Sequence, residues 1–177
     1  MSPVNRGDFE VLVTAASKRG ATAEISQLIA DTLISEGITT SLMPVEEVTS
    51  INQYDAVIAG SAIYGGRWLE PARRFLENHY EELKHRLVWL FSAGPAGQPG
   101  ARSGTSRETV RLCALVDPLE HKVFSAGIPF GAPELRPPDA PGSAVPLWDP
   151  DEVRRWALCV GGAVCAAATP PSDASFR

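Results

Sequence analysis

Three short runs of this chain are apolar at nearly every position, the pattern of strands that are buried on both faces of a sheet. The runs are Phe9–Ala15, Asp55–Ile63 and Leu87–Phe91. Two further strand candidates are Ile38–Met43 and His121–Ile128. A strand with one solvated face would instead alternate apolar and polar residues. The chain is therefore expected to form a five-stranded sheet with both faces covered.

Stretches with helical spacing of apolar residues lie between these strands. They are Ala21–Glu36, Trp68–Tyr80, Thr105–Leu115 and a last helix that follows Asp149. Asp149 is a strong helix start, because its carboxylate can accept from a free backbone N–H at the N-cap. The alternation of strands and helices predicts an α/β, doubly wound parallel sheet with helices on both faces. Such sheets bind ligands beyond the carboxyl ends of their strands.

The 177 residues are enough for one domain, expected over residues 9–168. Residues 1–8 are expected to be a flexible leader, and residues 169–177 a disordered tail. Residues 129–147 hold six prolines and two glycines, which predicts an irregular surface connection within the domain.

The composition excludes several classes of function. A formal net charge of −5 argues against nonspecific nucleic-acid binding. Three cysteines without a CxxC pair favour a reducing compartment. The N-terminus has no apolar signal segment, and the longest apolar stretch, 157–168, is shorter than the roughly 20 residues that span a bilayer. We expect a cytoplasmic protein with no transmembrane segment and no metal; peripheral membrane contact and the oligomeric state stay open.

The turn after the first predicted strand is a candidate anion site. Ser17, Gly20 and Thr22 precede or open a helix, where free backbone N–H groups and hydroxyls can surround a phosphate. A plain strand-to-helix turn with a threonine cap is an equal alternative. The dinucleotide fingerprint GxGxxG and the P-loop pattern are both absent here. A phosphorylated receiver domain is also excluded, because Gly60–Ala62 supplies no acceptor aspartate.

Three segments of the sequence resemble the flavodoxin-like FMN proteins. They are SKRGAT (17–22), YDAVIAGSAIYGGRW (54–68) and VWLFSAGP (88–95). The similarity is greatest to the branch of flavodoxin-domain proteins that includes the menaquinone-dependent protoporphyrinogen oxidases. It covers Val11–Pro95 and continues more loosely through HKVFSAG (121–127) and WDPDEVRRWA (148–157). The resemblance implies FMN as cofactor and the strand order 2-1-3-4-5.

The same resemblance implies which residues hold the cofactor. The phosphate loop would consist of Ser17, Lys18, Arg19, Gly20, Ala21 and Thr22. The two loops beside the isoalloxazine ring would consist of Ala62, Ile63, Tyr64, Gly65 and Gly66, and of Ser92, Ala93, Gly94 and Pro95. Tyr64 would stack on the ring or lie exposed, and Trp68 would shield the ring edge or pack the start of a helix. A carbonyl of Gly65 or Gly66 would face the flavin N5 atom, because glycine makes the required peptide rotation inexpensive.

The function that this likeness implies is an oxidoreductase that passes electrons through bound FMN. The donor is unknown, and the acceptor would be a small molecule, a quinone or a redox partner. The chemistry resides in the cofactor, so no catalytic side chain is predicted. Two alternatives remain, a protoporphyrinogen-oxidising enzyme and a non-catalytic binding module. Two departures from the family pattern motivate the binding module. Arg19 stands where many flavodoxins have threonine, and the third loop has no aromatic residue.

Overall fold

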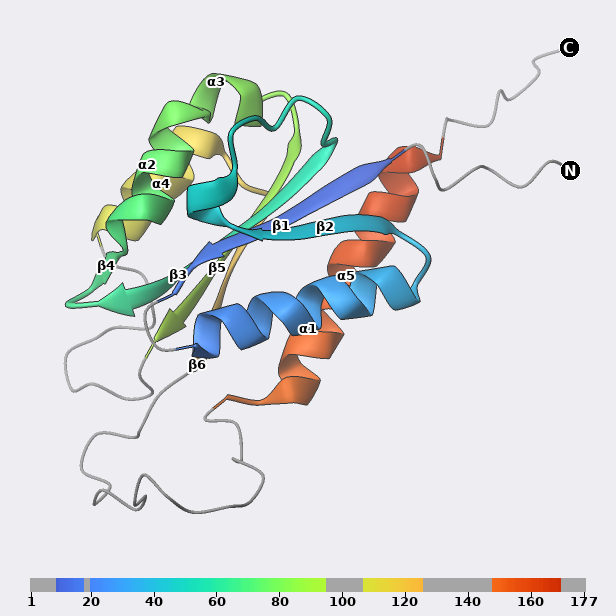
Figure 1. The fold of residues 1–177 in the computed structure, drawn as a ribbon, viewed down its shortest axis with the longest axis horizontal. Coiled ribbons are helices and arrows are strands. Elements are labelled where there is room, and N and C mark those ends of the chain that lie inside the picture. The colour runs from blue at the N-terminus through green and yellow to red at the C-terminus, as the bar shows by residue number, and fades with distance from the viewer. Residues whose placement is uncertain (1–8, 18–19, 95–106, 126–147, 170–177) are drawn as a thin grey trace, which may run out of the picture.

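The computed structural model describes residues 9–17, 20–94, 107–125 and 148–169. The predicted leader (1–8), the proline-rich connection (129–147) and all but the first residue of the predicted tail (169–177) lie outside these ranges. The described residues form a layered α/β structure (Figure 1).

The sheet has five parallel strands and one short antiparallel strand. The parallel strands follow the order β2-β1-β3-β5-β6, so that β1, β3 and β5 are neighbours in its centre. Counting only the parallel strands, this is the expected order 2-1-3-4-5. The strands are β1 (Glu10–Ala16), β2 (Thr39–Pro44), β3 (Ala56–Tyr64), β4 (Arg67–Trp68), β5 (Leu87–Gly94) and β6 (Glu120–Ser125).

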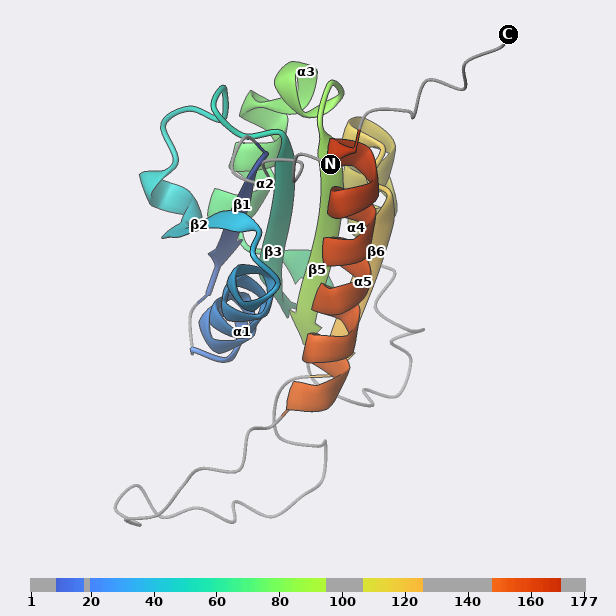
Figure 2. The same cartoon turned by 90° about the vertical axis from the view of Figure 1, so that its right-hand side faces the viewer.

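Helices cover both faces of the sheet, as the two-sided burial of its strands requires (Figures 1 and 2). The first face carries α1 (Ala21–Ser35) and α5 (Pro150–Ala168), and the second carries α2 (Glu70–Asn78), α3 (Tyr80–Leu83) and α4 (Arg107–Val116). A 3₁₀ turn, Val45–Glu47, follows β2. The Asp149 carboxylate accepts from the backbone N–H of Asp151 at 2.9 Å, which confirms the predicted cap of the last helix.

The predicted helix over Trp68–Tyr80 differs from the observed structure. Trp68 belongs to β4, which pairs antiparallel with the end of β3, and the helix begins only at Glu70. It ends at Asn78, and Tyr80–Leu83 forms a separate turn of helix. The physical reason is a glycine pair before β4, whose positive φ angles fold the chain back onto β3.

A close contact joins two paired residues of β3 and β5, Gly60 and Phe91. A Cβ placed on Gly60 would overlap the ring of Phe91, so only glycine fits at this position. The Phe91 ring also meets Phe124 and Trp156, with ring centroids 6.1 and 6.3 Å away. Aromatic contacts therefore join β5 and β6 to α5 across the first face.

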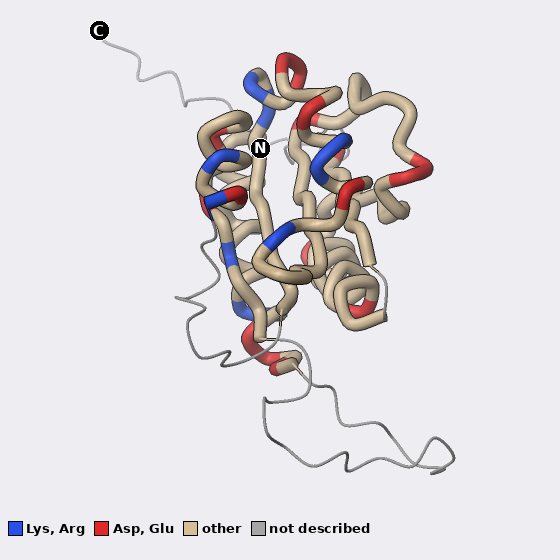
Figure 3. Tube along the Cα trace, turned by 90° about the vertical axis from the view of Figure 1, so that its left-hand side faces the viewer, with Lys and Arg blue, Asp and Glu red and all other residues tan. Residues whose placement is uncertain are grey.

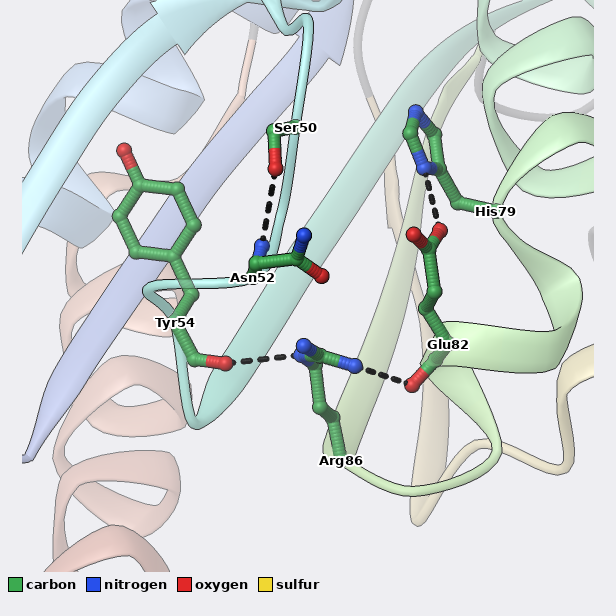
Figure 4. A network of polar contacts seen from close by, with 6 residues as sticks. All are labelled: Ser50, Asn52, Tyr54, His79, Glu82 and Arg86. Atoms are coloured by element: carbon green, nitrogen blue, oxygen red, sulfur yellow. Dashed lines mark hydrogen bonds and ion pairs between the residues drawn. The ribbon is translucent and has the colours of Figure 1, made fainter.

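A polar network ties down the opposite end of the same strands (Figure 4). Arg86, directly before β5, donates through Nε to the carbonyl of Tyr54 and through Nη1 to the carbonyl of Glu82, at 2.8 and 2.5 Å. The Glu82 carboxylate lies 2.7 Å from Nδ1 of His79. These bonds connect the turn before β3 to α3 at the amino ends of the strands.

Replacement of Gly60 by alanine should lower the free energy of unfolding by about 2–3 kcal/mol, because the added Cβ would overlap the ring of Phe91, which already packs against Phe124 and Trp156. Denaturant unfolding measures the change. Gly162→Ala is the matched control: this exposed glycine lies within α5, and an added Cβ there meets nothing within 4 Å. The control should raise stability by about 0.5–1 kcal/mol. A neutral Gly60→Ala would contradict the packing described here.

Replacement of Thr14 by valine should stabilise the protein. The Thr14 side chain is fully buried in β1, and its hydroxyl has no hydrogen-bond partner among the described residues. A buried hydroxyl without a partner costs about 1–3 kcal/mol, and valine removes it while keeping the branched shape. Thermal and denaturant unfolding should show a gain of about 1 kcal/mol. A loss of stability would show that the hydroxyl has a partner.

Candidate functional site

The three loops singled out in the sequence meet at one edge of the sheet. They follow β1, β3 and β5, which are adjacent strands. The carboxyl ends of these strands are in register, because Ala16 pairs with Ser61, and Ala62 with Ala93. Parallel strands end on the same side, so the strand ends that lead into the three loops lie next to one another. Lys18, Arg19 and Pro95 lie outside the described residues.

The first loop ends in a helix N-terminus that no described side chain caps. Gly20 is the N-cap residue of α1, with a φ of 92°, and an added Cβ there would meet nothing within 4 Å. The first helical hydrogen bond joins the N–H of Glu24 to the carbonyl of Gly20, so the three preceding N–H groups have no acceptor within the helix. Ser17 Oγ accepts from the Gly20 N–H at 3.2 Å. Thr22, in contrast, is buried.

The second loop is a tight hairpin between β3 and β4. Gly65 and Gly66 have φ angles of 56° and 75°, and positive φ at both central residues defines the turn type that matches the natural twist of a two-residue hairpin. Tyr64 is exposed at the start of this turn. A Cβ on Gly94 would lie 3.3 Å from the Cβ of Ile63, so the second and third loops are in close contact.

A buried polar group lies directly beneath these two loops. Ser92, predicted as a ring-loop residue, is fully buried, and its Oγ lies 2.8 Å from Nε1 of Trp68 and 2.8 Å from Nε2 of His121. The Trp68 side chain is only 2% exposed, so it packs inside the protein rather than lying open at the edge. Sequence reasoning gave His121 no role, because nothing in the chain links it to Ser92 29 positions earlier.

The Ser92–His121 pair has the spacing of a nucleophile and its base, but not the environment. A nucleophilic hydroxyl must be reached by a substrate, whereas Ser92 has no exposed surface and already accepts a hydrogen bond from an indole N–H. Burial lowers the pKa of His121, although the nearby carboxylate of Glu120 partly opposes this. The pair is therefore structural.

Charges of both signs are interspersed over the described chain rather than gathered in one region (Figure 3). Arg67 is exposed in β4, beside the hairpin. A hollow of about 360 Å³ borders the first loop on its β2 side and shares Ser17 with it. Within the described ranges, no three metal-ligating side chains gather, and none of the helices has the length and apolar character that crossing a bilayer requires.

Solved structures with the same fold include proteins of two kinds. The rubredoxin oxygen:oxidoreductase of Desulfovibrio gigas matches with a TM-score of 0.64 and 13% identity, over 91% of this chain and 37% of that one. A flavodoxin from the domain Archaea matches at 0.61 and 12%, and a cysteine-to-serine mutant of the flavodoxin from Pseudomonas aeruginosa at 0.62 and 12%. Each of the two flavodoxin matches covers 89% of this chain and 99% of the other.

The chain thus spans little more than a third of the first of these proteins and almost the whole length of the flavodoxins. A family model described as a flavodoxin domain matches residues 12–124, which contain all three loops and the buried polar group beneath them. The chain belongs to the flavodoxin domain family, whose members bind FMN and transfer electrons.

Proposed function

We propose that this chain binds FMN at the carboxyl ends of β1, β3 and β5 and passes electrons through it to a small-molecule or quinone acceptor. The observation that carries the proposal is the uncapped N-terminus of α1 behind Gly20, at the same edge as the hairpin and the end of β5. Its free N–H groups and the positive end of the helix dipole would hold the phosphate. The bound flavin would supply the redox chemistry.

The other loops would bind and enclose the ring. Tyr64 is the exposed aromatic side chain at this edge and would lie against it. Gly65 and Gly66 have no Cβ to hinder rotation of the peptide between them, so the hairpin can present either a carbonyl or an N–H. From β5, the backbone near Gly94 would contribute rather than the side chains of Ser92 and Ala93, because both side chains are buried.

The nature of the acceptor is the finer part of the proposal. The sequence similarity to menaquinone-dependent protoporphyrinogen oxidases, including the residues 148–157 that open α5, favours a quinone acceptor and a porphyrinogen donor as the second candidate. An assay with protoporphyrinogen and a quinone tests it. Porphyrin fluorescence that rises faster than in the enzyme-free reaction would support that candidate. If FMN-loaded protein produces no such fluorescence, this candidate is wrong, and electrons pass between another donor and acceptor.

Titration with FMN and with riboflavin tests the proposed site. The purified chain should quench the fluorescence of FMN and bind it more tightly than riboflavin, which lacks the phosphate. Gly20→Ala should weaken FMN binding about tenfold or more, because alanine strains a backbone with positive φ by about 1–2 kcal/mol and shifts the phosphate donors. Riboflavin binding should change much less.

Gly37→Ala is the matched control for this experiment. Gly37 also has a positive φ, of 77°, with nothing within 4 Å of an added Cβ, but it follows the opposite end of α1. Both variants should lose similar stability, and only Gly20→Ala should lose preference for FMN over riboflavin. If the native chain binds no FMN at micromolar concentration, the proposal is wrong and a non-catalytic module is favoured.

A further inference from the structure

Three residues from different strands form a chain of hydrogen bonds beneath the hairpin. The indole N–H of Trp68 in β4 lies 2.8 Å from Oγ of Ser92 in β5, and that Oγ lies 2.8 Å from Nε2 of His121 in β6. The Trp68 and His121 rings are close, with centroids 6.4 Å apart. Ser92 is fully buried and Trp68 nearly so, which excludes solvent from most of this chain.

Chemistry fixes the direction of the first hydrogen bond, and the tautomer of His121 fixes that of the second. An indole N–H can only donate, so the Ser92 oxygen accepts from Trp68. The serine proton then needs an acceptor of its own, and Nε2 of a neutral His121 supplies one in the tautomer that carries the ring proton on Nδ1. When His121 becomes a cation, Nε2 carries a proton and can no longer accept. The buried hydroxyl proton of Ser92 then loses this acceptor.

This chain of bonds holds the base of the hairpin. A hairpin with a two-residue second strand is too short to be stable alone, so side chains must fix it. Trp68 is held twice, by Ser92 through its ring and by the Glu108 carboxylate, which accepts from its backbone N–H at 2.9 Å. The next residue, Leu69, donates its N–H to Ser61 Oγ at 2.9 Å. The two glycines at the tip have no side chains with which to make such bonds, so the tip depends on the anchored base.

We propose that Ser92 and His121 are positioning residues for the flavin-binding hairpin: through Trp68 they set the conformation of residues 64–67, and protonation of His121 loosens this hairpin and weakens FMN binding. The inference rests on the proposed function for its effect on FMN. Its structural part, control of the hairpin by His121, can be tested without any flavin.

The charged and titratable groups around His121 do not replace this link. Glu120, the neighbour in β6, extends to the other face of the sheet and accepts from an indole of α5. Glu108, in α4, is already engaged by Trp68 and by Arg73 of α2, 3.4 Å away. Burial raises the pKa of the Cys113 thiol in α4, so this group stays neutral. Burial also lowers the pKa of His121 and so favours its neutral form. Protonation of the ring is therefore expected at a lower pH than for an ordinary histidine.

The first experiment uses NMR of the apo protein between about pH 8 and pH 5, a range that brackets the ordinary pKa of histidine. The indole N–H signal of Trp68, assigned with Trp68→Phe, and the amide signals of Gly65 and Gly66 should shift together with the titration of His121. In His121→Gln the amide oxygen can accept from Ser92 but does not titrate, so these shifts should disappear. The proposal would be overturned if the hairpin signals did not shift as His121 becomes protonated, or if they shifted equally in His121→Gln.

The second experiment measures FMN affinity over the same pH range. FMN binding to the native chain should weaken about tenfold more on acidification than binding to His121→Gln, since losing a buried acceptor changes an equilibrium by roughly this factor. The phosphate of FMN also titrates near a pH of about 6, but this effect is common to both proteins and cancels in their ratio. His121→Leu and Ser92→Ala should bind weakly at every pH. His79→Gln, a change at the opposite end of the sheet, should behave like the native chain.

The outcomes separate this inference from the proposed function. If the native chain binds FMN and its affinity ratio to His121→Gln stays constant with pH, the positioning role is wrong and the proposed function stands. If the native chain binds no FMN even at the alkaline end of the range, the proposed function fails, and the hairpin signals alone decide whether His121 controls this segment. If His121→Leu does not fold, the native chain and His121→Gln still give the decisive comparison.

Discussion

The contact of Phe91 with Gly60 determines how the rest of this protein is arranged. The aromatic ring occupies the space that the Cβ of any residue other than glycine would need at position 60. The ring therefore lies close against the sheet. In this position it meets Trp156 of α5 and Phe124 of β6. The last helix is thereby fixed to the centre of the sheet, although residues 126–147 between β6 and α5 lie outside the described structure.

The next residue along each strand begins a layer of different chemistry. Ser61 and Ser92 directly follow Gly60 and Phe91, and because side chains alternate along a strand they point to the opposite face. There they bind the N–H of Leu69 and the indole of Trp68. The apolar core thus ends in hydroxyl groups that hold the loops at the edge of the sheet. The position of the hairpin depends on these two serines and on the register that the Gly60–Phe91 contact enforces.

The sequence alone was sufficient to predict the five parallel strands and the helix cap at Asp149, because these features depend on local patterns. The resemblance to flavodoxin-like proteins supplied the strand order, which the structure confirms. The sequence did not reveal β4: Trp68 looked like the first residue of a helix, and its true position depends on hydrogen bonds to Ser92 and Glu108, 24 and 40 positions away. The Gly65–Gly66 pair was a usable hairpin signal. His121 had no local signal, and the FMN-binding residues remain a prediction.

The network around Arg86 has a consequence for how the molecule opens. It closes the amino ends of β3 and β5 with bonds that involve backbone carbonyls on both sides, whereas the hairpin at the carboxyl end of β3 pairs with that strand at only two positions. Segments with fewer buried contacts exchange their amide hydrogens through local opening, without global unfolding. We therefore expect the amides of the hairpin, residues 63–68, to exchange faster than those at the amino ends of β3 and β5.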